Sequence, residues 1–364
     1  MKDRVNAHLL RVQPYQPGKP ASEVQREMGI AGVLKLASNE NLLGPSPLAV
    51  NALRENSVKM NFYPDGGCYY LRRRIAEKFS VPPSNVAIGS GTDEIIRILC
   101  QIFLRPGTQA VMGHPSFVMY LISPLVAGAD VVQVPLRDHT LDLDAMLDKV
   151  SDSTRIVFIS NPNNPTGTIV TKAETESFLA KLPPDVLAVF DEAYFEYVND
   201  PRSPDAMEYF RPDGNVAVLR TFSKVHGLAG LRVGYGFLPD AAADAFDRVR
   251  NPFNVNQAAQ EAALAALGDL DHVRKSVEFN RRGKLALCRG LDRLGVGYIP
   301  THANFILVNV RADSEEIFKK LLLRGIIVRP GRFLGYPTHV RVTIPSESDC
   351  PRFIDALEEA LAER

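Results

Sequence analysis

Residues 155–167 read Arg-Ile-Val-Phe-Ile-Ser-Asn-Pro-Asn-Asn-Pro-Thr-Gly, an apolar run of strand length that ends in a polar, turn-forming segment. Similar apolar runs begin near residues 86, 110, 130, 187 and 216, and helical patterns separate them. This alternation predicts an α/β fold with a mostly parallel sheet flanked by helices. Because ligands bind beyond the carboxyl ends of such strands, the residues directly after each run are candidates for a site.

The sequence changes character after about residue 260. An Ala-rich helix is expected to open at Gln257, and later apolar runs at 304–308, 326–328 and 340–343 accompany a helix near 315–324. We therefore predict an N-terminal arm over residues 1–33 that joins the small domain, a large domain over 34–260 and a small α+β domain over 261–364. The arm is expected to be irregular, because Pro and Gly residues between 14 and 20 interrupt any helix.

Composition narrows the function classes. The 364 residues include 42 Lys and Arg against 42 Asp and Glu, so the chain has no excess charge that would indicate a nucleic-acid partner. The four cysteines are widely spaced and form no metal-ligand or disulfide pattern. No apolar leader or membrane-spanning run occurs. We expect a cytoplasmic enzyme that acts on small molecules and holds no metal.

Residues 221–234, Thr-Phe-Ser-Lys-Val-His-Gly-Leu-Ala-Gly-Leu-Arg-Val-Gly, place one lysine among small and hydroxyl residues. A lysine that forms and breaks an imine needs room around its amine, which the glycines leave. Eight residues after Lys224, the guanidinium of Arg232 is suited to hold a phosphate by paired hydrogen bonds. The stretch predicts a Schiff-base site for pyridoxal 5'-phosphate. A Ser-Lys pair alone would more often be a solvated turn.

Three further segments follow strand-like runs and remain ambiguous one by one. Residues 89–94, Gly-Ser-Gly-Thr-Asp-Glu, either hold an anion at a helix N-terminus or form a plain turn. The loop 161–167 either is a solvated turn or contains a cis X-Pro bond near a site. Asp191 either caps a helix or pairs with a protonated ring nitrogen, which makes the ring a better electron acceptor.

Taken in order, these motifs resemble those of the fold-type I aminotransferases, over essentially the whole chain. Within that group, the sequence looks most like the histidinol-phosphate aminotransferases, on the strings at 14–18, 36–41 and 63–66 (Pro-Tyr-Gln-Pro-Gly, Leu-Ala-Ser-Asn-Glu-Asn and Tyr-Pro-Asp-Gly). The resemblance implies the fold of a pyridoxal phosphate-dependent transferase, with a large and a smaller α+β domain. It also implies a homodimer whose active site is shared across the interface.

The resemblance implies roles around the cofactor ring. Lys224 forms the Schiff base and then moves the proton between substrate and cofactor, and Asp191 pairs with the ring nitrogen. Tyr194 and Asn164 hydrogen-bond the phenolic oxygen, and Phe117 stacks on the ring. The family often has Tyr where Phe117 stands, so a hydroxyl contact to the substrate is absent here.

The resemblance also implies an anion cradle and a substrate pocket. The phosphate is held near Gly91, Thr92, Asp93, Ser223 and Arg232, and by Tyr63 of the neighbouring subunit. Arg341 grips the substrate carboxylate, Arg329 and Tyr15 are assigned to a distal phosphate, and Asn39 also faces the substrate. His226 is interpreted as a packing residue beside the lysine loop and not as the catalytic base.

The implied reaction is transamination between L-glutamate and imidazole-acetol phosphate, which gives 2-oxoglutarate and L-histidinol phosphate in histidine biosynthesis. An aromatic amino acid aminotransferase is the first alternative, and a phosphothreonine decarboxylase is the second. A non-catalytic, pyridoxal phosphate-binding transcription regulator is a rival of a different class. Such regulators carry an N-terminal helix-turn-helix module, for which the thirty-residue arm is too short.

Overall fold

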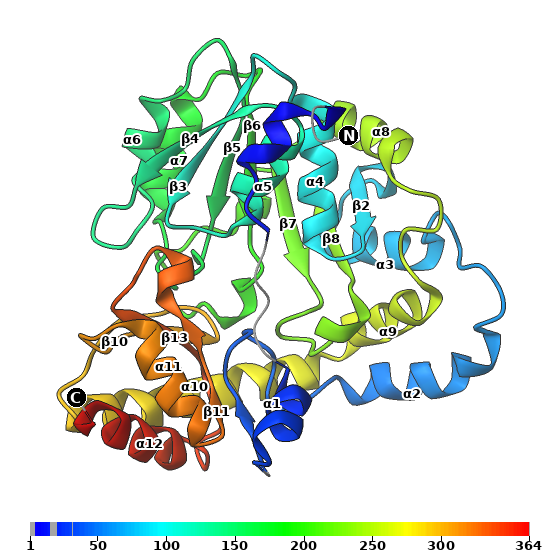
Figure 1. Cartoon of the computed structure of the whole chain (residues 1–364). Helices are drawn as coiled ribbons and strands as arrows, with labels where there is room; N and C mark the ends of the chain where they lie inside the picture. The colour runs from blue at the N-terminus through cyan, green and yellow to red at the C-terminus, as the bar shows by residue number, and fades with distance from the viewer. Residues whose placement is uncertain (1–3, 15–19, 31, 364) are drawn as a thin grey trace.

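A seven-stranded sheet forms the centre of the protein in a computed structural model that describes residues 4–14, 20–30 and 32–363 (Figure 1). In spatial order, its strands are β2 (Val86–Gly89), β8 (Gly234–Phe237), β7 (Val216–Thr221), β6 (Leu187–Asp191), β5 (Thr154–Ser160), β3 (Gln109–His114) and β4 (Asp130–Pro135). The strands from β7 to β4 pair in parallel, and β8 is antiparallel to both of its neighbours. The predicted α/β fold class with a mostly parallel sheet is confirmed.

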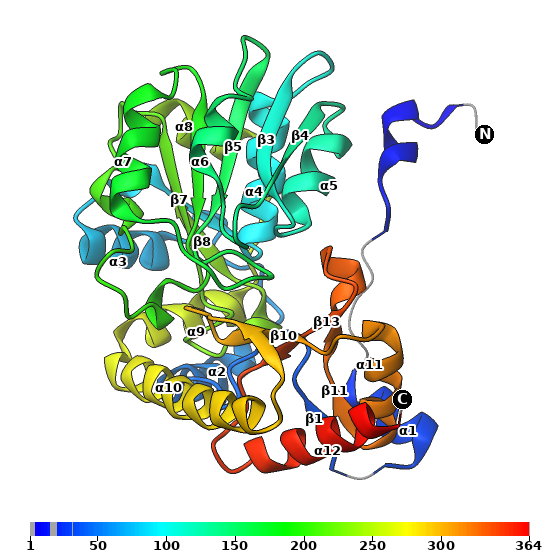
Figure 2. The same cartoon turned by 90° about the vertical axis from the view of Figure 1, so that its left-hand side faces the viewer.

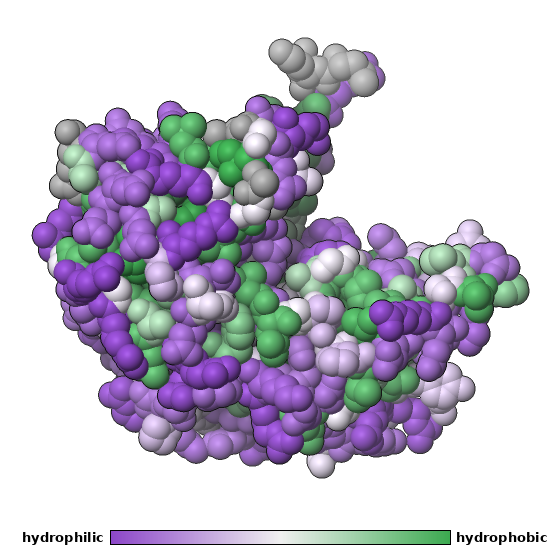
Figure 3. All heavy atoms as spheres, turned by 90° about the horizontal axis from the view of Figure 1, so that it is seen from below, coloured by the Kyte–Doolittle hydropathy of each residue, from purple (hydrophilic) through white to green (hydrophobic). Residues whose placement is uncertain are grey.

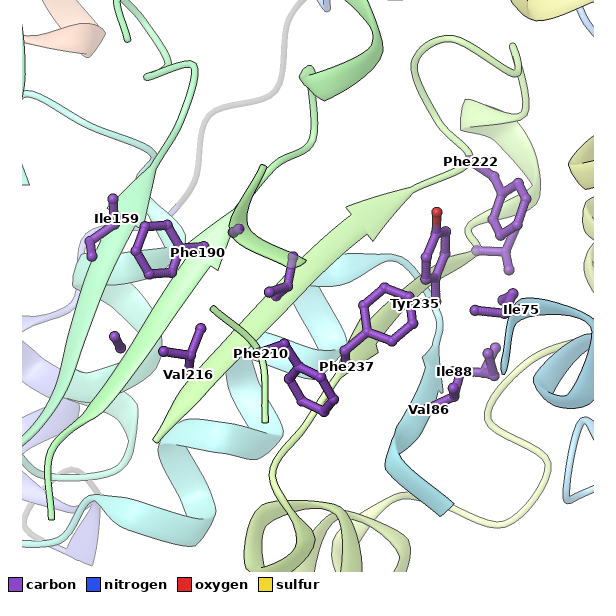
Figure 4. Close-up of a cluster of buried hydrophobic side chains, with 14 of the residues drawn as sticks. Ile75, Val86, Ile88, Ile159, Phe190, Phe210, Val216, Phe222, Tyr235 and Phe237 are labelled. Atoms are coloured by element: carbon purple, nitrogen blue, oxygen red, sulfur yellow. The ribbon is translucent and has the colours of Figure 1, made fainter. Parts of the chain in front are cut away.

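Helices cover both faces of this sheet. On one face lie α4 (Thr92–Phe103), α5 (Met119–Val126) and α8 (Asp240–Val249); on the other lie α2 (Pro47–Asn56), α3 (Tyr69–Phe79), α6 (Leu143–Leu147), α7 (Lys172–Lys181) and α9 (Gln257–Gly268). Strand β6 shows why: Leu187 and Val189 join one core, whereas Ala188 and Phe190 join the other. Successive side chains of a strand point to opposite faces, so a strand that is apolar throughout is buried on both faces of the sheet. Figure 4 shows Phe190 in the core on the α3 and α9 face, together with Phe237 and Ile75.

Strand β8 was not expected from the sequence, because its four residues include two glycines. A Cβ atom at Gly236 would lie 2.8 Å from Cδ2 of Leu219, and one at Gly234 would lie 2.8 Å from the backbone nitrogen of Thr92. Both contacts are too close for a side chain. The glycines therefore let β7 and the start of α4 approach β8, and they remove the β-rich pattern that would reveal a strand.

A second, antiparallel sheet lies toward the C-terminus, with β12 (Arg329–Pro330), β13 (His339–Thr343), β10 (Phe305–Asn309) and β9 (Gly297–Ile299) in that order (Figure 2). It packs with α10 (Leu270–Arg293), α11 (Ser314–Leu323) and α12 (Cys350–Ala362) around a separate apolar core. The long helix α10 was also not expected. The N-terminal half of its buried face carries His272, Ser276 and Asn280, so an apolar helical period is missing there.

The described segments of the N-terminal region contact both the large-sheet part and the C-terminal part of the protein. The short helix η2 (Ala7–Arg11) contacts α5, and Arg11 donates to Asp130 at the start of β4 at 3.0 Å. Strand β1 (Leu34–Lys35) pairs in parallel with β11 (Ile326–Ile327). The expectation of an irregular arm is wrong over α1 (Ala21–Met28). Pro20 stands at the N-cap of α1, where a missing N–H group costs nothing, so this proline begins a helix instead of breaking one.

Six more 3₁₀ turns connect these elements: η3 (Ser57–Lys59), η4 (Pro83–Asn85), η5 (Phe195–Tyr197), η6 (Ala206–Glu208), η7 (Ala229–Leu231) and η8 (Gly331–Leu334). In the part of the chain that the structure describes, no helix has the length and apolarity needed to cross a membrane. The same residues contain no group of three histidine, cysteine or carboxylate side chains suited to a metal ion.

Candidate active site

The predicted site residues gather at one edge of the large sheet. Asp191 is the last residue of β6, Lys224 lies three residues after β7, and Asn164 lies four residues after β5. Gly91 follows β2, which runs in the same direction as β7 because both are antiparallel to β8. The carboxyl ends of four strands therefore meet at the edge where α/β sheets hold ligands.

Asp191 is a buried carboxylate with a fixed orientation. Only 4% of the residue is exposed, its Oδ2 atom accepts a hydrogen bond from the Tyr120 hydroxyl at 2.7 Å, and its Oδ1 atom accepts one from the backbone N–H of Ala193 at 3.1 Å. Burial raises the pKa of Asp191 to about 6, and the Tyr120 hydrogen bond acts against that rise. The ionised form of such a buried carboxylate is stabilised most by a cationic partner.

Lys224 and Tyr194 face each other near this carboxylate. The Lys224 Nζ atom lies 5.5 Å from the centre of the Tyr194 ring, and the positive charge of Lys224 helps to lower the pKa of Asp191. The Tyr194 hydroxyl accepts a hydrogen bond from Nδ2 of Asn39 at 2.9 Å. Asn39 is 1% exposed, and its Oδ1 atom is buried without a hydrogen-bond partner among the described residues.

Arg232 closes an anion cradle at the start of α4. Its Nη1 atom lies 3.5 Å from Oγ of Ser223, and its Nη2 atom lies 3.4 Å from Oδ2 of Asp93. Gly91 caps the helix with φ +77°, and a Cβ atom there would lie 2.6 Å from Nη2 of Arg232. The glycine therefore keeps the guanidinium close to the N–H groups at Thr92 and Asp93, and this arrangement is suited to a phosphate.

Two arginines from the second sheet form the other side of the site. Arg341 of β13 donates from Nη1 to Oδ1 of Asn164 at 2.6 Å and from Nη2 to the carbonyl oxygen of Ala37 at 3.0 Å. Arg329 of β12 lies directly opposite Arg341 in the strand register, and both residues are less than 10% exposed. Two like charges side by side on neighbouring strands favour an anionic ligand.

The remaining predicted residues are distributed differently. Phe117 contacts the Tyr120 ring edge to face at 5.5 Å, so it lies beside the hydrogen-bond partner of Asp191. Tyr63 is 83% exposed and stacks on Phe253, at the surface of this single chain. Tyr15 lies outside the described residues.

Two expectations about the loops around the site agree with the structure. The Asn161–Pro162 peptide bond is cis, within the loop that follows β5. His226 is buried at 3% exposure beside the Phe222 ring, and burial lowers its pKa to about 3. A histidine that stays neutral at working pH fits a packing role.

Sequence reasoning missed the partners that support the site residues. Tyr120, the donor to Asp191, is 71 residues away in the sequence, and no local motif connects the two residues. It also missed Glu192 and Arg220, which form a buried ion pair at 2.8 Å behind Asp191. These contacts depend on strand order, which no local pattern reveals.

The site can hold a flat phosphorylated ring that carries an aldehyde and a basic nitrogen. The cradle at Gly91 and Arg232 matches a phosphate, the buried carboxylate of Asp191 matches a protonated ring nitrogen, and the Lys224 amine matches an aldehyde. Pyridoxal 5'-phosphate has all three of these groups. The residues present therefore fit the cofactor that the sequence predicts.

Comparisons with known proteins agree with this geometry. The family model described as aminotransferase class I and II matches residues 31–357. The chain is 50% identical to a histidinol-phosphate aminotransferase of Moorella thermoacetica, over 97% of this chain and 92% of the relative, and 44% identical to one of Caldicellulosiruptor saccharolyticus, over 96% and 98%. A crystal structure of histidinol-phosphate aminotransferase from Sinorhizobium meliloti in complex with pyridoxal-5'-phosphate superimposes with a TM-score of 0.90 at 26% identity, over 99% and 98% of the two chains. The family predicted from the sequence is confirmed: the chain belongs to the class I and II aminotransferases.

Proposed function

We propose that this protein is a pyridoxal phosphate-dependent transaminase that exchanges an amino group between L-glutamate and imidazole-acetol phosphate. The products are 2-oxoglutarate and L-histidinol phosphate, and the reaction belongs to histidine biosynthesis. The observation that carries the proposal is the convergence of the Lys224 amine, the buried Asp191 carboxylate and the Arg232 cradle at one sheet edge. The relatives named above support the choice of substrate, because they match along nearly their whole length.

The cofactor supplies an aldehyde that condenses with amines and a ring that, when protonated at its nitrogen, accepts the electron pair left by the α-proton. We assign Arg232, Ser223 and the N–H groups near Gly91 to its phosphate, and Asp191 to its ring nitrogen. Because Asp191 is buried, its negative charge holds a proton on that nitrogen more strongly than an exposed carboxylate would.

Four further residues complete the proposed environment of the ring. Tyr194 and Asn164 are assigned to its phenolic oxygen, and Phe117 is assigned to its face. The amine of Lys224 is assigned the transfer of the α-proton at Nζ, since it is the amine that faces both Tyr194 and Asp191.

The arginine pair accounts for the two different substrates. Glutamate brings an α-carboxylate and a side-chain carboxylate, whereas histidinol phosphate, an amino alcohol, brings a phosphate and no carboxylate. We assign Arg341 to the carboxylate and Arg329, with Tyr15, to the distal phosphate, and Asn39 is assigned to the substrate as well. A planar guanidinium binds either anion through two parallel hydrogen bonds, so one pocket serves both halves of the reaction.

A steady-state comparison tests the substrate. The purified holoenzyme would be supplied with 2-oxoglutarate and, in separate reactions, with L-histidinol phosphate, L-phenylalanine and L-tyrosine, and kcat/KM would be measured for each. A fourth reaction, with phosphothreonine, would be followed for release of CO₂. We expect histidinol phosphate to be preferred by at least about tenfold, because only it matches the second arginine. A preference for the aromatic amino acids would make the protein an aromatic aminotransferase, and CO₂ release would make it a decarboxylase.

We also propose a homodimer with shared active sites, located in the cytoplasm. Large apolar side chains are exposed along one short stretch from η3 to the start of α3: Val58, Met60, Phe62, Tyr63, Tyr69 and Tyr70. Figure 3 shows hydrophobic surface on the side of the molecule that α2 forms. A monomer seldom exposes so much apolar surface in one region, which supports a second copy as its cover. The four cysteines are all free thiols, as is usual in a reducing compartment.

Mixing two inactive variants tests whether the sites are shared. If Tyr63 serves the neighbouring subunit, dimers of Lys224→Ala with Tyr63→Ala chains contain one intact site. Random reassociation of such twofold dimers should then restore roughly a quarter of the wild-type activity. No recovery, in a mixture that light scattering shows to be dimeric, would mean that Tyr63 does not act across the interface.

A further inference from the structure

The hydrogen bond between Tyr120 and Asp191 has a defined direction. Tyr120 is 1% exposed, and its pKa is raised well above the ordinary value by burial and then by the charge of Asp191. The phenol therefore stays protonated across the working pH range and always donates, and the carboxylate always accepts. The 2.7 Å distance is that of a well-formed O–H···O hydrogen bond.

The ring of Tyr120 is held from two sides. It stacks on Phe158 of β5 at 4.8 Å and 12° between planes, and it meets Phe117 edge to face at 5.5 Å. These contacts leave the hydroxyl little freedom to leave Asp191. Since Oδ1 of Asp191 is engaged by the backbone N–H of Ala193, one donor on each oxygen fixes the plane of the carboxylate.

We infer that Tyr120 is a positioning residue that keeps Asp191 ionised and correctly oriented for the ring nitrogen of the cofactor. The inference rests on the proposed function, because it assigns Asp191 to that nitrogen. Without the phenol, a carboxylate in the same buried place would hold its own proton more tightly. Cofactor binding near neutral pH would then require removal of that proton first.

The other charged and titratable groups that act on this pair are Asp93 at the start of α4 and Lys224 after β7, which act on Asp191, and Tyr194 after β6, which acts on Tyr120. All three remain when only Tyr120 changes. Tyr120→Phe keeps the ring and its two aromatic contacts and removes only the hydroxyl. A matched control is Tyr209→Phe, which also removes a buried hydroxyl, but one that has no hydrogen-bond partner among the described residues.

The experiment measures the dissociation constant of pyridoxal 5'-phosphate for the apo forms of wild type, Tyr120→Phe and Tyr209→Phe between pH 6 and pH 9. We expect Tyr120→Phe to bind roughly tenfold more weakly than wild type at pH 6.5, since hydrogen bonds to charged groups are strong. The ratio of the dissociation constant of Tyr120→Phe to that of wild type should shrink toward one by pH 9, where Asp191 is ionised in both proteins. Tyr209→Phe should match wild type throughout.

A second comparison removes the charge. In an Asp191→Asn background, adding Tyr120→Phe should change the dissociation constant by less than about twofold, because the two substitutions act on one interaction. Two results would assign Tyr120 to packing and overturn the inference. One is an equal loss of cofactor affinity in the wild-type and Asp191→Asn backgrounds, and the other is a ratio of the Tyr120→Phe and wild-type dissociation constants that does not depend on pH.

No substrate is needed for these measurements, so they separate the inference from the choice of amino acid. If wild type binds the cofactor and the ratio is flat, only the role of Tyr120 is wrong. If wild type does not bind pyridoxal 5'-phosphate at all, the proposed function fails and the inference falls with it.

Discussion

Replacing Asp191 by Asn should make the protein without cofactor more stable, although it should disable the enzyme. Asp191 is 4% exposed, and burial raises its pKa from the ordinary 3.8 to about 6. Each step of one in pKa corresponds to about 1.4 kcal/mol, so the ionised carboxylate costs the folded apo protein about 3 kcal/mol at pH 8. Asn has nearly the same shape and carries no charge; its oxygen can accept from the Ala193 N–H group while its amide nitrogen donates to the Tyr120 hydroxyl oxygen.

The sign of the pH dependence follows from the same shift. Because the folded protein binds the Asp191 proton more tightly than the unfolded chain, the stability contributed by this proton is complete below pH 3.8 and is lost as the pH rises through about 6. The advantage of Asp191→Asn should therefore be about 3 kcal/mol at pH 8 and roughly half of that at pH 5. Burial also raises the pKa of Glu192, to about 7, but Glu192 is present in both proteins and cancels in the comparison.

Urea unfolding of the two apo proteins at pH 5 and pH 8 measures this difference. Addition of pyridoxal 5'-phosphate should reverse the order at pH 8, since only the carboxylate pairs with a protonated ring nitrogen. An apo variant that is less stable than wild type at pH 8, or an advantage that is equal at both pH values, would refute the reasoning that Asp191 is held as a destabilised charge for the cofactor.

Four further substitutions, one of them with a matched control, test other parts of the site. Gly91→Ala should weaken binding of pyridoxal 5'-phosphate by at least about tenfold in equilibrium dialysis, because the new methyl group displaces Arg232 from the cradle. Gly107→Ala, which has a similar positive φ and no neighbour within 4 Å, should lose stability but keep its affinity. Arg341→Lys should raise KM for glutamate by roughly tenfold or more and affect histidinol phosphate less, and Arg329→Lys should do the opposite; equal effects on both substrates would contradict the division of roles. Lys224→Ala should abolish turnover, and a fully active variant would remove the basis of the proposal.

The large sheet was predictable because its parallel strands are buried on both faces. Such strands appear as continuous apolar runs, and the run at 155–160 and that at 187–190 became β5 and β6. Strand β8 was not predictable, since close packing against β7 and α4 replaced its side chains with glycine. Helix α10 was missed for the opposite reason: its buried face near the site is polar, so burial left no apolar pattern.

The candidate site could be proposed from the sequence where a residue type by itself limits the chemistry that it can perform. Lys224 follows β7, Asp191 ends β6 and Arg232 directly precedes β8. Tyr120 could not be found in this way, because a buried tyrosine in an apolar helix is normally a packing residue. Its contact with Asp191 exists only because β3, which leads into α5, pairs with β5, and β5 pairs with β6.

The central claim is that one amine, that of Lys224, carries the cofactor. The most direct measurement is reduction of the holoenzyme with sodium borohydride, followed by proteolysis and mass spectrometry of the peptides. The account predicts one phosphopyridoxyl group per chain, on the peptide that contains Lys224, and its absence when saturating glutamate is added before reduction. A label on a different lysine, or no label in a protein that catalyses transamination, would contradict it.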